Sequence, residues 1–129
     1  MDGTVGIRTE RMRFVGEQNH AGTTPMHLCR DAFQGLVRLI SSLNERLKEV
    51  AVPATVWTIG RVDLHPNANS VVPGRADFTI QWRDADDARL DRMQDIIYAS
   101  AAEISKELEL EWHHLGCDKV SPTHSDPQL

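Results

Sequence analysis

Apolar residues recur along this chain with the two periods that distinguish strands from helices. Apolar and polar positions alternate over residues 7–15, which predicts a strand that ends at Gly16. Residues 55–62 are rich in β-branched side chains and predict a second strand. Residues 76–83 alternate strictly and predict a third strand with one buried face and one polar face. A last short strand is expected around 110–112, and the tail from Leu115 shows no period.

Two other segments carry the three- and four-residue apolar spacing of amphipathic helices. The first is predicted to open at Pro25, with Thr24 as its N-cap. Its apolar positions form one stripe: Phe33, Leu36, Val37, Ile40, Leu43 and Leu47. The second is expected to be capped by Asp84. Its stripe is Leu90, Met93, Ile97, Ala101, Ile104 and Leu108.

The predicted elements follow the order β-α-β-β-α-β, which is the order of a ferredoxin-like α+β fold. In this fold two helices cover one face of a four-stranded antiparallel sheet. The other face is predicted to be polar and to meet solvent or a partner, because its third-strand positions are Asp77, Thr79, Gln81 and Arg83. We expect one helix face and an edge strand to pair two copies, since open strand edges invite pairing.

Composition narrows the class of protein. The 129 residues are 40% hydrophobic and carry a formal net charge of −5, as expected of one globular domain. The acidic balance argues against a nucleic-acid partner, and no apolar run approaches the length of a membrane span. The basic group Arg8, Arg11 and Arg13, interrupted by Glu10, is interpreted as a solvated strand face. Two cysteines, Cys29 and Cys117, are expected to be reduced thiols of a cytoplasmic protein.

The polar loop 17–24 holds the densest candidate chemistry. His20 lies among short side chains close to the expected helix start, so it should reach solvent. A histidine there could transfer a proton or donate a hydrogen bond to developing negative charge. It could equally serve only to cap the loop, and spacing alone leaves both interpretations open.

A longer string around this histidine carries a family resemblance. The run Asn-His-Ala-Gly-Thr-Thr-Pro-Met at 19–26, followed by Arg-Asp-Ala at 30–32, resembles the signature of the N-carbamoyl-L-amino acid hydrolase and allantoate amidohydrolase family. This family belongs to a larger group of metal-dependent aminoacylases, dipeptidases and carboxypeptidases. The resemblance continues through 60–62, 66–68 and 71–74 to Arg83. The small domain of the family is itself a ferredoxin-like dimerisation domain.

The resemblance implies that residues 1–129 form the dimerisation (lid) domain of a larger two-domain hydrolase whose catalytic metal domain is absent from this sequence. The parent would cleave the C–N amide of N-carbamoyl amino acids or related ureido acids such as allantoate. His20 matches a family histidine that stabilises the tetrahedral intermediate in the partner's active site. Arg83 matches a family arginine that binds the substrate carboxylate, and a guanidinium fork suits a carboxylate. Without the family, Arg83 would be interpreted as a surface charge paired with Asp84 or Glu109.

The sequence departs from the family pattern at two positions. A substrate-binding asparagine is expected where Ser70 stands, while Asn69 precedes it. Either Ser70 takes the polar role or a local shift presents Asn69. The family motif Asp-x-Arg is here Gln81-Trp82-Arg83, which makes the outer face of the sheet less acidic.

No metal site is expected in this chain. The resemblance places two divalent metals, such as zinc, manganese or cobalt, in the catalytic domain, and the ligand motifs of that domain do not occur here. His113 and His114 are adjacent and should point to opposite faces of a strand. The His-x-Asp at 124–126 has no partner ligands.

We therefore expect the chain to be inactive alone and to act on a small ureido acid only within a homodimeric parent enzyme. No nucleic-acid or membrane partner is expected. The alternative, from a different class, is a free-standing ferredoxin-like regulatory module that binds a small ligand or a partner protein. A third possibility is a purely structural dimer module.

Overall fold

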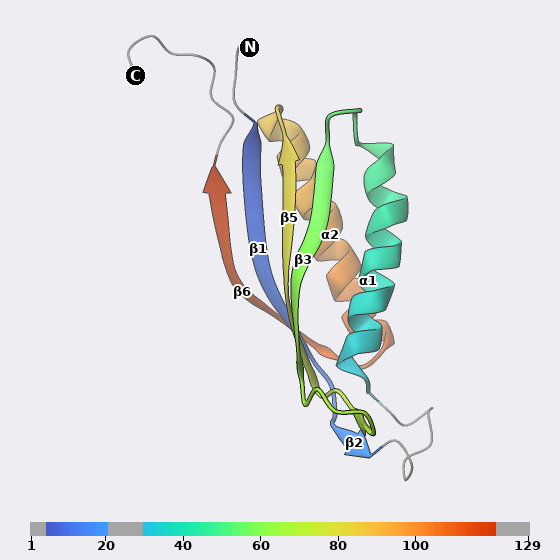
Figure 1. Cartoon of the computed structure of the whole chain (residues 1–129). Coiled ribbons are helices and arrows are strands. Elements are labelled where there is room, and N and C mark those ends of the chain that lie inside the picture. The colour runs from blue at the N-terminus through green and yellow to red at the C-terminus, as the bar shows by residue number, and fades with distance from the viewer. Residues whose placement is uncertain (1–4, 21–29, 121–129) are drawn as a thin grey trace.

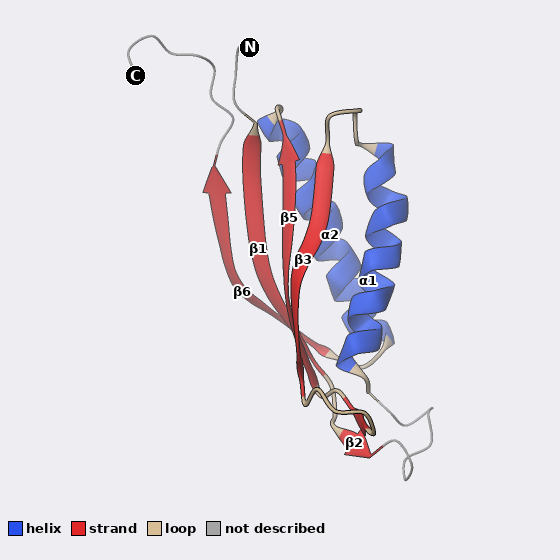
Figure 2. Ribbon diagram, viewed as in Figure 1, coloured by secondary structure: helices blue, strands red, loops and turns tan. Residues whose placement is uncertain are grey.

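The computed structural model describes residues 5–20 and 30–120 of the chain. One four-stranded antiparallel sheet has two helices on one face (Figures 1 and 2). The strands lie in the order β3-β5-β1-β6, and a separate two-stranded ladder joins β2 to β4. The strands are β1 (Gly6–Val15), β2 (Asn19–His20), β3 (Val56–His65), β4 (Val71–Val72), β5 (Arg75–Asp84) and β6 (Glu111–Val120). The helices are α1 (Ala32–Arg46), a 3-10 turn (Leu47–Glu49) and α2 (Asp87–Glu107). The ferredoxin-like prediction is confirmed.

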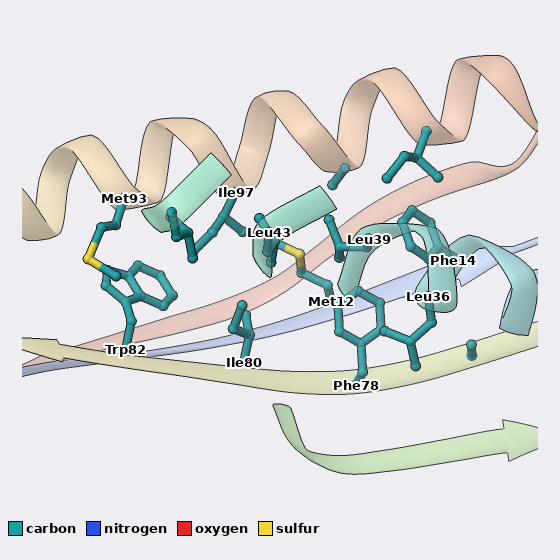
Figure 3. Close-up of a cluster of buried hydrophobic side chains, with 14 of the residues drawn as sticks. Met12, Phe14, Leu36, Leu39, Leu43, Phe78, Ile80, Trp82, Met93 and Ile97 are labelled. Carbon is teal, nitrogen blue, oxygen red and sulfur yellow. The ribbon is translucent and has the colours of Figure 1, made fainter. Parts of the chain in front are cut away.

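The core lies between the sheet and the two helices (Figure 3). The inward positions of β5 are buried, as the alternation predicted, and its outward positions are polar. Phe14 of β1 contacts Phe78 of β5, with ring centroids 5.4 Å apart. The indole N–H of Trp82 donates to the carbonyl of Leu90 at 3.2 Å, so this buried donor is satisfied. The predicted stripe of α2 is also confirmed, since its members up to Ile104 are buried.

Both helices start later than predicted. α1 begins at Ala32, because the side chain of Asp31 accepts hydrogen bonds from the N–H groups of Phe33 and Gln34. The expected start at Pro25 is therefore wrong, and Thr24 and Pro25 lie outside the described residues.

α2 begins at Asp87, and its N-cap is Asp86, not Asp84. The Asp86 side chain accepts from the N–H of Ala88 at 3.0 Å. Asp84 is instead the last residue of β5 and accepts from the N–H of Asp86 at 2.8 Å.

The apolar stripe of α1 is only partly buried. Leu36, Leu43 and Leu47 face the core as expected, and Leu39, which lies outside the predicted stripe, is fully buried as well. Phe33, Val37 and Ile40 are 37–42% exposed. The apolar arc of α1 is thus wider than the surface that the sheet can cover, which leaves one apolar side of the helix open.

Strand β6 is longer than predicted. It continues to Val120, so the expectation that the tail from Leu115 lacks regular structure is wrong for residues 115–120. A register shift opposite Arg11 and Met12 interrupts the alternation, and this bulge hid the period. A Cβ at Gly116 would lie 2.6 Å from a guanidinium nitrogen of Arg11, so glycine suits this position. The end of β6 returns beside the start of β1, with Val120 opposite Ile7.

The basic group of β1 is split between the two faces of the sheet. Arg8 and Glu10 are buried under the helices, so their interpretation as part of a solvated face is wrong. The guanidinium of Arg8 pairs with Asp87 at 3.1 Å and with Asp91 at 2.6 Å, which offsets the cost of its burial. Arg11 and Arg13 lie on the open face. No helix in the described part of the chain is long and apolar enough to cross a membrane.

Candidate functional site

The backbone of His20 is held beyond one end of the main sheet. β2 pairs with β4 in antiparallel fashion, with His20 opposite Val71 and Asn19 opposite Val72. The N–H of Gly16 donates to the carbonyl of Gly74 at 2.8 Å. These bonds attach the small ladder to the ends of β1 and β5 (Figure 1). Neither two-residue strand was predicted, because such short segments show no period.

Two glycines permit this close approach of the backbone. A Cβ at Gly16 would lie 1.9 Å from the carbonyl oxygen of Arg30, and a Cβ at Gly74 would lie 2.9 Å from the nitrogen of Gln18. The N–H of Glu17 donates to the same Arg30 carbonyl at 2.8 Å. Backbone bonds therefore fix the segments on either side of His20, and larger residues would push them apart.

Ser70 and Asn69 lie at the same end of the domain. Both are exposed in the turn that directly precedes β4. Since Val71 pairs with His20, Ser70 is one residue from the partner of the histidine. Neither side chain forms a hydrogen bond to another described residue. The fold therefore brings together His20, Ser70 and Asn69, which the sequence nominated separately.

Arg83 lies at the opposite end of the sheet. It follows Arg75 by eight positions on β5, and at roughly 3.3 Å per residue this is a separation of about 26 Å. Figure 1 shows β2 at the end remote from the β5 arrowhead. Arg83 stands between Ile7 of β1 and Val56 of β3 in the sheet register. Within one chain, Arg83 is therefore far from His20.

The guanidinium of Arg83 contacts a neutral side chain. Its Nε and Nη2 atoms donate to Oε1 of Gln81 at 3.2 and 2.8 Å. The amide nitrogen of Gln81 donates in turn to the hydroxyl of Thr9 at 3.1 Å. Neither Asp84 nor Glu109 pairs with Arg83, contrary to what the isolated sequence pattern indicated.

Asp84 anchors the strand end that carries Arg83. Its side chain is buried on the helix side of the sheet. It accepts from the hydroxyl of Thr55 at 2.6 Å, from the N–H of Asp86 at 2.8 Å and from the guanidinium of Arg89 at 2.8 Å. Burial alone would raise the pKa of the Asp84 carboxyl, but these three donors outweigh it and hold that pKa below its usual value.

A second group of titratable side chains lies on the helix side, beneath β6. The Tyr98 hydroxyl donates to Glu10 at 2.5 Å, and Nε2 of His114 contacts the other oxygen of this carboxylate. Burial, followed by the nearby Glu10, raises the pKa of the Tyr98 hydroxyl and of the Cys117 thiol. Sequence reasoning missed this cluster, although Glu10 occupies an inward position between Arg8 and Met12.

The described residues hold no group of three or more histidine, cysteine, aspartate or glutamate side chains arranged for a metal ion. His113 and His114 lie opposite Arg13 and Met12, on different faces of the sheet, as predicted. The side chain of His113 contacts Glu111 at 3.0 Å. Cys29 and the His-x-Asp at 124–126 are outside the described residues.

The four-stranded sheet with two helices on one face is a ferredoxin-like α+β domain. The two-residue strand of His20 lies at one end of this sheet and Arg83 lies at the other. Residues 3–109 match the Peptidase dimerisation domain family, and the chain belongs to this family.

Particular relatives are amidohydrolases. The chain is 32% identical over 127 residues to the N-carbamoyl-L-amino-acid amidohydrolase of Paenarthrobacter aurescens, covering 95% of this chain and 31% of the relative. It is 42% identical over 86 residues to the allantoate amidohydrolase of Escherichia coli (strain K12), covering 67% and 21%. A solved hydantoinase/carbamoylase family amidase from Burkholderia vietnamiensis superposes with a TM-score of 0.91 at 31% identity, covering 98% and 30%. The resemblance seen in the sequence is confirmed, and the chain spans less than a third of the length of these proteins.

Proposed function

We propose that this chain is the dimerisation (lid) domain of a metal-dependent amidohydrolase that cleaves the C–N amide of N-carbamoyl amino acids or related ureido acids. The names of the relatives, of which this chain spans 31% and 21% of the length, support this assignment. Two divalent metals in the remaining part of such an enzyme, such as zinc, manganese or cobalt, would supply an activated water. The described residues hold no group of side chains arranged for a metal pair. In the proposed enzyme this domain would contribute substrate binding, closure and charge stabilisation.

The distance between Arg83 and His20 within one chain is the observation that supports active sites shared between two subunits. A gap of about 26 Å is far longer than a ureido acid. Arg83 is opposite Ile7, at the end where β1 begins and β6 ends. A catalytic domain joined to these two strands would lie next to Arg83 of its own chain. His20 is at the remote end, from which it would serve the partner's site.

Each residue has a distinct role in this arrangement. Arg83 would bind the substrate carboxylate through its planar fork. His20 would donate a hydrogen bond to the carbonyl oxygen as negative charge develops during attack by water. Ser70, or Asn69 beside it, would add a polar contact from the same end of the partner lid. The family asparagine is thus replaced by a hydroxyl or displaced by one position.

The open apolar side of α1 and the edge strand β3 are the surface through which two copies would pair. Phe33, Val37 and Ile40 on α1 are exposed, and Val62 on β3, which lies opposite the inward Phe78 and so faces the helix side, is 39% exposed. A groove of about 240 Å³ lies between the helix and the strand. Exposed apolar side chains gathered beside a groove are typical of interaction sites. The other edge, β6, carries charged residues near its two ends, at Glu111, Asp118 and Lys119.

Mixed dimers of the full-length protein test the function and the sharing of sites together. Hydrolysis of N-carbamoyl amino acids, β-ureidopropionate, allantoate and ureidoglycolate is measured with added divalent metal. We expect His20→Ala to lower kcat by about 10²–10³-fold, and Arg83→Ala to raise KM. If subunits share sites, mixing and reassociating the two variants restores about a quarter of the wild-type activity at substrate concentrations well below KM, where each variant alone is nearly inactive, because half of the dimers are mixed and each has one intact site.

The outcomes separate the two parts of the proposal. Hydrolysis of none of these substrates would refute the assigned function. Hydrolysis without restoration in the mixed dimers, once subunit exchange is shown, would refute the contribution of His20 in trans. The 129-residue chain alone is expected to be inactive, and hydrolysis by it would contradict the division of labour between two domains.

A further inference from the structure

The side chain that holds Arg83 is the neutral amide of Gln81. Gln81 and Arg83 are two residues apart on β5 and therefore lie on the same open face of the sheet. The Nε and Nη2 atoms of Arg83 both donate to the single Oε1 of Gln81, at 3.2 and 2.8 Å. This contact fixes one edge of the guanidinium.

A second contact holds the Gln81 side chain in place. Gln81 faces Thr9 across the β1–β5 pair, and its amide nitrogen donates to the Thr9 hydroxyl at 3.1 Å. The amide oxygen points towards Arg83, because a reversed amide would set two N–H donors against the guanidinium. Thr9 therefore holds the far end of the amide while its oxygen accepts from Arg83.

This geometry leaves a second edge of the guanidinium open. An arginine has five N–H donors, and Gln81 engages one on Nε and one on Nη2. Both N–H groups of Nη1 and the second of Nη2 have no partner among the described residues. Nη1 and Nη2 together form a fork that matches the two oxygens of a carboxylate.

The charge of Arg83 also remains uncompensated. No described carboxylate lies within ion-pair distance of this guanidinium, whereas Arg13 on the same face is paired with Asp77 at 2.6 Å. A neutral acceptor orients the group but does not compete as an anion for it. A carboxylate at position 81 would orient the group and also neutralise it.

We propose that Gln81, held by Thr9, is a positioning residue that orients Arg83 through a neutral contact and leaves its Nη1/Nη2 fork fully charged for the carboxylate of the substrate. This inference rests on the proposed role of Arg83 in binding. By this inference, the neutral Gln81 amide increases the affinity for acidic substrates. A carboxylate at position 81 would not do so, because it would neutralise Arg83.

Kinetics of the full-length protein with paired substrates test the proposal. N-carbamoyl amino acids are compared with their carboxamides, which lack the anion. Gln81→Ala is expected to raise KM for the acids roughly 3- to 10-fold, the value of about one hydrogen bond, with kcat changed less than twofold. KM for the carboxamides should not change. Gln81→Glu, similar in size, should raise KM for the acids about 2- to 5-fold through neutralisation.

Nuclear magnetic resonance of the 129-residue chain gives a readout that does not depend on turnover. The Arg83 Nε–H should exchange with water about 2- to 12-fold faster in Gln81→Ala than in the wild type. Gln81→Glu should retain the slow exchange, because its carboxylate still accepts from Nε. Thr79→Ala is the matched control, since Thr79 is the next outward residue of β5 and makes no hydrogen bond to Gln81 or Arg83. It should change neither KM nor exchange.

The possible failures are distinguishable. If Gln81→Ala leaves KM and Nε–H exchange at wild-type values while Arg83→Ala raises KM, the positioning role is refuted and the role of Arg83 stands. If Gln81→Glu binds acids as well as the wild type, the neutral charge of the amide has no function. If Arg83→Ala leaves KM for the acids unchanged, the proposed function of Arg83 fails, and the inference fails with it.

Discussion

Removal of the Asp84 carboxylate should cost the domain much of its stability. In Asp84→Ala, three donors lose their acceptor at once: the hydroxyl of Thr55, the N–H of Asp86 and the guanidinium of Arg89. The Arg89 side chain is 20% exposed, so water partly screens the charge that is left behind. Breaking a fully buried ion pair costs about 3–5 kcal/mol. We place this variant near the lower bound, at a loss of about 3 kcal/mol in the free energy of unfolding.

The loss should depend on pH in a defined direction. The pKa of Asp84 is lowered in the folded protein, so its ionised form favours folding. The contribution is complete above the unfolded pKa of 3.8 and disappears as the pH falls through the folded pKa. The difference between wild type and Asp84→Ala should therefore be constant from pH 7 to about pH 5 and shrink below pH 4.

Urea denaturation of both proteins at pH 7, 5 and 3 measures this difference directly. Asp63→Ala serves as the matched control, because Asp63 is exposed and, among the residues that the structure describes, pairs with the exposed Arg61 alone; the variant should change stability by less than about 1 kcal/mol. A difference below about 1 kcal/mol for Asp84→Ala at pH 7, or one that is equally large at pH 3, would refute the reasoning.

Three further predictions concern packing, assembly and reactivity. Gly16→Ala should lower the melting temperature, because its Cβ would lie 1.9 Å from a backbone oxygen, and an unchanged melting temperature would contradict the tight approach. Val37→Asp should shift a dimer towards monomer in sedimentation velocity, whereas Ala99→Asp on the exposed side of α2 should not; equal association by both would exclude the α1 surface. The Cys117 thiol, whose pKa is raised first by burial and then by Glu10, should be alkylated at pH 8 at least about tenfold more slowly than in urea. Equal rates would show that the thiol is not protected.

The regular parts of the fold were predictable because their periods are long and unbroken. The alternation of β5 and the stripe of α2 each extend over most of an element, and both predict the correct buried face. The helix starts were not predictable to the residue. Asp84, Asp86 and Asp87 are all suitable caps, and only the burial of Asp84 beside Thr55 and Arg89 excludes it. The bulge at Leu115 likewise breaks an alternation that the sequence alone cannot restore.

For the candidate site, the sequence indicated which residues matter but not how they are arranged in space. His20, Ser70, Asn69 and Arg83 were nominated through the family resemblance, and their roles remain proposals. The sequence did not predict that His20 and Arg83 lie at opposite ends of the sheet, because their positions depend on strand direction and register. Inward charges such as Glu10 were misassigned, since a charged residue in a strand is usually exposed.

The start of β1 and the end of β6 lie side by side, since Ile7 is paired with Val120. The strand β2, which contains His20, lies about 26 Å from this edge. A rotation of about 10° about this edge would sweep the far end through roughly 4.5 Å, more than the reach of a hydrogen bond. If two subunits share each site as proposed, a small tilt of one subunit would thus bring its His20 into the active site of the other or withdraw it.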